Sequence, residues 1–445
     1  MGALKIRLAG AGEKTQYIVH EFNDNTIRFV LRYPGIVDAD VLCAAARAVV
    51  ESVDVLHASF ATDSIGAYWH VNQEYGESSY FQYVETEADP YVTACSLALL
   101  PIESEGRVQL RCCLVQSSTD SAVMLSISHL CVDGGDGKYL LGKLVEAYNL
   151  ILEKGTAEAL SVKNGSRAAE QVYENVSSKE FLSLFKNPIS AVKSAFPYPT
   201  EGAGRVRMVR AEIAQKVMGA ARSRAKAVDA TANDLLLTAC YRAYATLPGI
   251  DASGPMSVMS MMDLRRHCKN GESEGLCNMS GSLPTVLNDG VRGSFSDTLA
   301  VIAAQTRVAK ENSLAGLEGM PLVHSASKTL PMGLLLLVAK KIYGSISIGL
   351  TNLGNLSCDQ LKLGETAPIG GMFGGPLKKK PAMQVSAISF DGAVTLCVVG
   401  SFTKEDGELL QMMLDRMVAE IKKFGEGIDE RCADTGDQAE RFCGQ

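Results

Sequence analysis

The sequence lacks the features of a membrane-spanning or secreted protein. Its longest apolar run, residues 334–339, is far shorter than the ~18 residues that a transmembrane helix needs. Residues 1–12 contain no apolar core of the kind found in a secretory signal. We therefore expect a cytoplasmic protein whose cysteines are reduced thiols.

The sequence also lacks an excess of positive charge and any spacing typical of a metal site. It has 43 lysines and arginines against 50 aspartates and glutamates, which gives a net charge of -7, so nothing indicates binding to nucleic acid or to an anionic membrane. Among its 12 cysteines, Cys112 and Cys113 are adjacent and would face opposite sides of a strand. His267, Cys268 and Cys277 have no second close pair beside them. We expect no metal, and we expect most cysteines to act as small buried apolar residues.

The chain has no internal repeat at a fixed period, yet its two halves are alike in kind. At 445 residues it exceeds the ~150 residues of an ordinary domain. Each half combines several strands with capped helices and shows no strict β-α-β alternation, which predicts an α+β fold. We predict a first subdomain at 1–160, a connecting segment at 161–200, a second subdomain at 201–426 and a polar tail at 427–445.

Periodicity and capping residues locate the main elements. Alternating or continuous apolar runs predict strands, and apolar residues at helical spacing behind a capping residue predict helices. The expected strands are 26–33, 106–115, 122–129, 205–211, 256–264, 345–352, 383–390 and 393–400. The expected helices are 38–53, 138–153, one that begins near 213, 231–246, 296–310 and one capped by Thr403.

One stretch, residues 124–137, combines an apolar run, a histidine, an aspartate and a group of glycines. On a strand, Val123, Leu125, Ile127 and His129 share one face, so the imidazole points the same way as core residues. This predicts either an activated base at a strand end or a core histidine before an ordinary turn. The spacing alone favours neither. Residues 134, 135 and 137 are glycines, which we expect to turn the chain sharply before the next helix.

Five motifs in order resemble one enzyme superfamily. His-x-x-x-Asp-Gly at 129–134 is similar to the signature of the acyltransferases that include chloramphenicol acetyltransferase, peptide-synthetase condensation domains, plant BAHD enzymes and alcohol acetyltransferases. Residues 55–60, 231–237, 263–266 and 351–354 resemble four further signatures of these enzymes. There are two departures. Ser128 stands where many condensation domains have another histidine. The BAHD signature Asp-Phe-Gly-Trp-Gly is not present, and residues 371–376 resemble it only weakly.

The resemblance implies both a fold and an activity. The fold would be two chloramphenicol-acetyltransferase-like subdomains in a V, with mixed sheets flanked by helices and a tunnel between them. The activity would be acyl transfer, in secondary metabolism, from an acyl-CoA or acyl-pantetheine thioester to a small alcohol or amine. An acyl carrier protein is a further possible partner, and no permanently bound cofactor is implied. The alternative is a non-catalytic module that docks a carrier protein or scaffolds a biosynthetic assembly.

The resemblance also implies roles for single residues. His129 would be the general base, and Asp133 would pair with an arginine of the second half, for which Arg265 is the first choice and Arg266 the reserve. Gly134 would serve the turn and allow the acyl donor to approach the backbone.

The remaining candidates are weaker. Asn352, Thr351 and Ser280 are possible oxyanion donors or tunnel-lining residues, or simply strand residues. The basic run 378–380 is either a site for CoA phosphates or a solvated group of charges. The sequence also offers a set of methionines for an adaptable acyl pocket or for ordinary core packing. These are Met256, Met259, Met261, Met262 and Met279.

Overall fold

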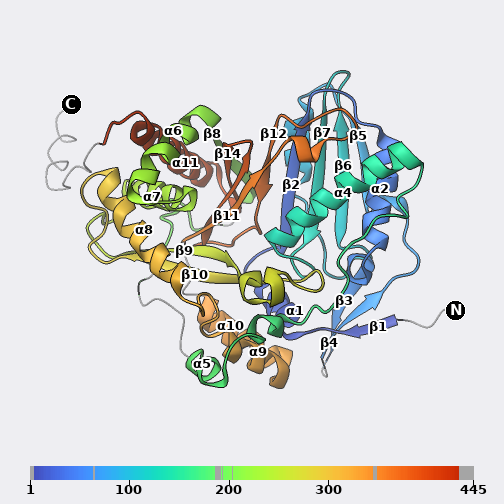
Figure 1. The fold of residues 1–445 in the computed structure, drawn as a ribbon, viewed down its shortest axis with the longest axis horizontal. Coiled ribbons are helices and arrows are strands. Elements are labelled where there is room, and N and C mark those ends of the chain that lie inside the picture. The colour runs from blue at the N-terminus through green and yellow to red at the C-terminus, as the bar shows by residue number, and fades with distance from the viewer. Residues whose placement is uncertain are drawn as a thin grey trace.

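The chain folds into three β-sheets flanked by helices (Figure 1). The structure is a computed structural model that describes residues 5–63, 66–185, 192, 194–202, 204–343 and 348–429. The strand orders are β1-β4-β3, β12-β2-β7-β6-β5 and β10-β9-β11-β13-β14-β8. The mixture of parallel and antiparallel pairs agrees with the predicted α+β class.

The strands are β1 (Lys5–Leu8), β2 (Thr26–Tyr33), β3 (Ala58–Thr62), β4 (Ala67–Val71), β5 (Phe81–Glu85), β6 (Leu110–Gln116), β7 (Ser121–Ser128), β8 (Arg205–Ile213), β9 (Met256–Asp263), β10 (Ser280–Leu287), β11 (Ile348–Leu356), β12 (Gly370–Gly374), β13 (Met383–Phe390) and β14 (Ala393–Phe402). The α-helices are α1 (Ala11–Val19), α2 (Ala39–Glu51), α3 (Pro90–Leu97), α4 (Gly134–Lys154), α5 (Ser178–Ser183), α6 (Gln215–Ala225), α7 (Ala232–Ala245), α8 (Phe295–Glu311), α9 (Met320–Thr329), α10 (Met332–Tyr343) and α11 (Lys404–Gly425).

The five-stranded sheet is covered on both faces, which explains its apolar central strand. In β7 every residue is buried. Leu125 and Ile127 face the core that α2 and α4 complete, whereas Met124 faces α3 on the other side. Because side chains alternate along a strand, a continuous apolar run is what two covered faces require. Helices α2 and α4 lie together over one face of this sheet (Figure 1).

The six-stranded sheet forms the second core. Helices α6, α7 and α11 contribute buried apolar residues to it, among them Leu235, Leu410 and Met417. Strands β13 and β14 form the predicted hairpin at Asp391 and Gly392, whose φ angles of 46° and 94° are those that such a turn needs.

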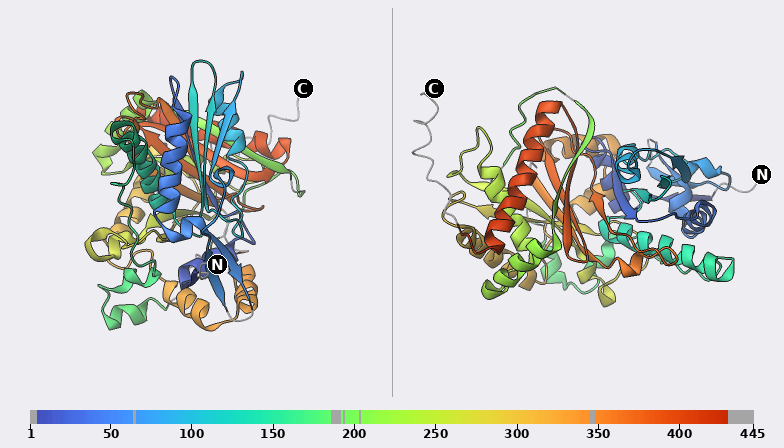
Figure 2. Two further views of the ribbon diagram at one scale, coloured as in Figure 1. Left: turned by 90° about the vertical axis from the view of Figure 1, so that its right-hand side faces the viewer. Right: turned by 90° about the horizontal axis from the view of Figure 1, so that it is seen from above.

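One strand from the second half of the sequence lies in the first sheet. β12 pairs antiparallel with β2, although its residues fall inside the range predicted as the second subdomain. It also contacts β13 and β14, so it joins the two large sheets (Figures 1 and 2). The subdomain boundaries stay a prediction. Periodicity in the sequence did not reveal that β12 would pair with a strand of the first half.

Most predicted elements appear within a few residues of their expected bounds. The predicted capping residues Asp38, Thr231 and Thr403 each accept a hydrogen bond from the first turn of their helix. Two expectations were wrong: α8 is capped by Ser294, and α4 begins at Gly134 instead of 138. Residues 345–347 of an expected strand, and 430–445 of the expected tail, lie outside the described residues.

Several expected absences concern only the described part of the chain. Over those residues, none of the helices has the length and apolar character needed to span a bilayer. No group of three histidine, cysteine or acidic side chains in the described ranges is arranged to hold a metal ion. All ten described cysteines are free thiols, and eight of them are buried, as expected of small apolar residues.

Candidate active site

His129 stands at the point where β7 leaves the sheet. Its backbone N–H donates to the carbonyl of Asn25, 2.7 Å away, so the ladder between β2 and β7 continues one step past the strand. The side chain keeps part of its surface accessible, whereas the residues on either side of it are buried. A rigid strand therefore presents the imidazole at its end.

The hydrogen bonds of His129 define its tautomer. Nδ1 lies 2.8 Å from the carbonyl oxygen of Val132, which can only accept a hydrogen bond. Nδ1 therefore carries the proton in the neutral ring, and Nε2 carries the lone pair. The amide nitrogen of Asn278 also lies 3.1 Å from Nδ1, but in this tautomer both atoms are donors, so the contact is not a hydrogen bond, and the Asn278 amide donates to Gln16 Oε1 at 3.1 Å. The ring is held on its Nδ1 side, and no hydrogen bond joins Nε2 to any residue that the structure describes.

The surroundings of His129 favour the neutral ring. Burial lowers its pKa, and the positive charge of Lys378 lowers it further, whereas Asp133 acts in the opposite direction. The net shift is downward from 6.5. At neutral pH the imidazole is therefore an unprotonated base.

Asp133 joins the His129 loop, which is the segment 129–133 between β7 and α4, to the second half of the chain. Its Oδ2 accepts from Arg265 Nη1 at 2.9 Å and from the backbone N–H of Met279 at 2.7 Å. Its Oδ1 accepts from Asp136 N–H at 2.9 Å and so caps α4. Burial acts to raise the pKa of Asp133, but the charge and hydrogen bonds of Arg265 bring it below its ordinary value. The arginine that the resemblance implied lies at this position.

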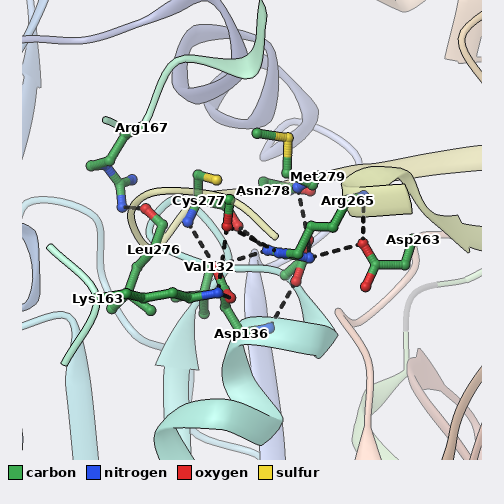
Figure 3. Close-up of polar contacts among 12 residues, drawn as sticks. Val132, Asp136, Lys163, Arg167, Asp263, Arg265, Leu276, Cys277, Asn278 and Met279 are labelled. Atoms are coloured by element: carbon green, nitrogen blue, oxygen red, sulfur yellow. Dashed lines mark hydrogen bonds and ion pairs between the residues drawn. The ribbon is translucent and has the colours of Figure 1, made fainter. Parts of the chain in front are cut away.

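Arg265 serves two buried carboxylates at once. Its Nη2 lies 2.8 Å from Asp136 Oδ2, and it also donates to the carbonyl of Cys277 at 3.0 Å. Lys163 reaches Asp136 from the opposite side (Figure 3). Burial and the nearby charge of Asp133 raise the pKa of Asp136. Arg265 Nη1 also lies 3.1 Å from Oδ1 of the exposed Asp263, so the network contains three carboxylates and two cations.

A second buried arginine holds the other side of the loop. Arg167 donates to the carbonyl of Cys131 at 2.9 Å and to that of Leu130 at 3.2 Å, and it also bonds the carbonyl of Leu276 (Figure 3). Its charge is met by Glu13, 2.8 Å away, which in turn accepts from Trp69. The backbone of the loop is thus bonded from both sides.

The glycines of the motif do not form the expected turn. None of the three has a positive φ, and all lie in the first turn of α4. A Cβ at Gly134 would lie 2.6 Å from Leu353, and one at Gly137 would lie 2.6 Å from Ile27. These glycines therefore permit close packing of α4 against β11 and β2, and the expectation of a turn was wrong.

Other predicted residues make no contact with the imidazole that the structure describes. Arg266 is exposed and donates to the carbonyl of Lys310. Asn352 accepts from Gly354 N–H within its own turn, and Ser280 is exposed. Within the described ranges, no hydrogen bond joins Asn352, Thr351 or Ser280 to the imidazole. Of the predicted methionines, Met256 and Met279 are buried, and the other three are partly exposed along β9. The oxyanion donors, the acyl pocket and the tunnel stay predictions.

The lysines of the run 378–380 point to three different places. Lys379 is exposed and donates to the carbonyl of Glu21, and Lys380 pairs with the buried Asp406. Lys378 is only partly exposed, and its charge acts on His129. The run is therefore not a uniformly solvated group of charges, and the site for CoA phosphates stays a prediction.

Sequence reasoning missed four residues that surround the site: Asn278, Asp136, Lys163 and Arg167. Asp136 follows Asp133 at helical spacing, a signal that was present in the sequence. The other three come from loops distant in sequence and carry no local pattern.

The fold is similar to that of solved acyltransferases and condensation domains. No protein-family model matches the sequence, and no curated protein matches it. The first condensation domain of the CDA synthetase has a TM-score of 0.68 at 15% identity, over 97% of this chain and 98% of that chain. Trichothecene 15-O-acetyltransferase from Fusarium sporotrichioides has a TM-score of 0.66 at 13% identity, over 93% and 95%. Polyketide synthase associated protein 5 from Mycobacterium tuberculosis has a TM-score of 0.65 at 14% identity, over 94% and 100%.

These similarities cover nearly the whole chain. At 13–15% identity they establish the fold and not the activity. The α+β fold that the motifs implied is confirmed: it is the fold shared by condensation domains and related acyltransferases.

Proposed function

We propose that the protein is an acyltransferase that moves an acyl group from a thioester to a hydroxyl or amine, with His129 as the general base. The observation that carries this proposal is the tautomer of His129. Nδ1 donates to the carbonyl of Val132, so the lone pair of Nε2 is left on a partly accessible ring at a strand end. The lowered pKa keeps that lone pair available at neutral pH.

The reaction requires one imidazole that acts first as a general base and then as a general acid. Nε2 removes the proton from the acceptor O–H or N–H while that oxygen or nitrogen attacks the thioester carbonyl carbon. The tetrahedral intermediate then collapses, the C–S bond breaks, and the imidazolium returns the proton to the departing thiolate. The products are the ester or amide and the free thiol of CoA or phosphopantetheine.

The bonds around the loop fit this role. A base acts efficiently only if its ring is held within reach of the acceptor. Two arginines hold the loop that follows His129: Arg265 binds the carboxylate of Asp133, and Arg167 binds the carbonyls of Leu130 and Cys131. We assign Asp133 and Arg265 to positioning. The donor type, CoA or carrier protein, and the choice of oxygen or nitrogen as nucleophile are for experiment.

The test is acyl transfer by the purified protein. We expect thiol release and a mass shift when acetyl-, hexanoyl- or carrier-bound acyl thioesters are incubated with a panel of alcohols and amines. His129→Ala should lower turnover by ~100 to 10,000-fold with only a small fall in melting temperature, because the substitution removes the base and its hydrogen bond to Val132. The control is His20→Ala, since His20 lies exposed on the surface.

Two outcomes would contradict the proposal. Full turnover in His129→Ala would exclude this residue as the base. Absence of transfer by the wild-type protein with every thioester would favour the alternative, a module that docks a carrier protein or scaffolds an assembly.

A further inference from the structure

Lys378 is a cation beside the base for which the proposed reaction has no use. It follows β12, and its backbone forms a bridge with Asn23, two residues before Asn25. Asn25 is the residue whose carbonyl accepts from His129 N–H. Lys378 and His129 therefore flank the same short segment that leads into β2, one on each side.

This arrangement brings the two side chains near each other. Backbones on either side of a common neighbour lie two strand spacings apart, and the offset between Asn23 and Asn25 adds ~7 Å along the strand, so the two Cα atoms are roughly 12 Å apart. The flexible four-carbon stem of a lysine covers much of that distance. The positive charge of Lys378 does act on the imidazole, where it lowers the pKa of His129.

The ammonium of Lys378 has no direct partner in the described part of the chain. The carboxylate that acts on it is Asp24, at longer range. Asp24 forms an ion pair with the fully buried Arg28 and accepts a hydrogen bond from the backbone N–H of Leu377 at 2.9 Å. Burial lowers the pKa of Lys378 to about 8, so the side chain is still largely protonated at pH 7.

A partly buried cation without a direct carboxylate partner is unfavourable unless a ligand supplies the negative charge. We propose, on the basis of the acyl-transfer function above, that Lys378 binds a carboxylate carried by the acceptor. The acceptor is then a hydroxy acid or an amino acid. The base contacts the acceptor's O–H or N–H, so a charge beside the base faces the same molecule.

This role differs from oxyanion stabilisation. A bound carboxylate is present throughout the reaction, so Lys378 would contribute mainly to acceptor binding and to KM. An oxyanion exists only near the transition state, so an oxyanion donor would contribute to kcat for every acceptor.

The first test measures binding and needs no turnover. Hydroxy acids of two to six carbons and the matching alcohols are titrated into the protein by calorimetry at pH 7. We expect the best hydroxy acid to bind at least ~10-fold more tightly than its alcohol, and Lys378→Met to remove that difference. Lys379→Met, which alters the exposed neighbour, should leave both affinities unchanged. Equal hydroxy-acid binding in wild type and Lys378→Met would overturn the proposal, whatever the outcome of the transfer assay.

The second test uses turnover with the same compounds as acceptors. Lys378→Met should raise KM for the hydroxy acid ~10-fold or more and leave kcat within about threefold, with little change for the alcohol. An equal fall of kcat for both acceptors at constant KM would overturn the proposal in favour of an oxyanion role.

Discussion

Two cations act on the loop that carries His129, and they differ in their partners. Arg265 contacts Asp133 and Asp136 directly, at 2.9 and 2.8 Å. Lys378 has no direct partner among the described residues, and the carboxylate that acts on it is Asp24. The arginine is 7% exposed and lies within a fully bonded network. The lysine keeps accessible surface next to the base.

The difference separates architecture from recognition. A charge whose bonds are all satisfied inside the protein stabilises one arrangement of the chain and has little left to offer a ligand. A charged group that is desolvated but unpaired lowers the stability of the fold, and such groups occur at functional sites where a ligand supplies the opposite charge. Arg265 therefore holds the loop, and Lys378 is available to a substrate.

The largest expected effect follows removal of Arg265. Arg265→Met leaves Asp133 and Asp136 buried without their guanidinium, so we expect a loss of about 3–5 kcal/mol in the free energy of unfolding. The loss should appear as a lower melting temperature and a lower urea midpoint at pH 7. It should shrink toward pH 4, because carboxyl groups that have lost their cation then become protonated.

Arg266→Met is the matched control for this substitution. Arg266 is exposed, and its guanidinium bonds only a backbone carbonyl on the surface, so a change within ~0.5 kcal/mol is expected. Equal melting of Arg265→Met and wild type would show that the ion pairs do not hold the loop.

Lys378 should show the opposite sign. The pKa of this lysine is lowered from 10.5 to about 8 in the folded protein. Between these values the unfolded chain binds more protons at this residue, so the fold gains stability as the pH rises from about 8 to 10.5. Lys378→Met lacks this group, and it should be more stable than wild type at pH 7 by about 2 kcal/mol, an advantage that shrinks as the pH rises through 8 and is lost above 10.5.

The measurement is the difference in unfolding free energy between wild type and Lys378→Met from pH 7 to 10, which cancels all other titrating groups. Lys379→Met serves as the exposed control and should show no such trend. A difference that stays constant over this range would mean that Lys378 is not an unpaired buried cation.

The sequence predicted the elements better than it predicted their contacts. Periodicity and capping located β2, β7 and α11, because burial on one or two faces leaves a repeated pattern. The insertion of β12 into the first sheet was missed, since its five residues, three of them glycine, carry no alternation. The packing role of Gly134 was missed too, because Leu353, which a side chain would meet, lies far along the chain.

Part of the candidate site was also predicted, but from motifs and not from periodicity. His129, Asp133 and Arg265 came from motifs whose spacing resembles a known superfamily, and the structure brings the last two into contact. Nothing in three consecutive lysines indicates which of them folds inward. That choice depends on the bridge between Asn23 and Lys378, which joins segments more than half the chain apart.

The smallest expected effect is on the pKa of His129, which both Lys378 and the Asp133 carboxylate influence. The charge of Lys378 lowers the pKa of His129, and Asp133 raises it. Lys378→Met removes the first influence, so the pKa of the imidazole should rise. The acid limb of kcat/KM, which reports the free enzyme, should therefore move to higher pH, with a neutral alcohol as acceptor. An unchanged limb would mean that Lys378 does not act on the base, and a shift to lower pH would contradict its positive charge.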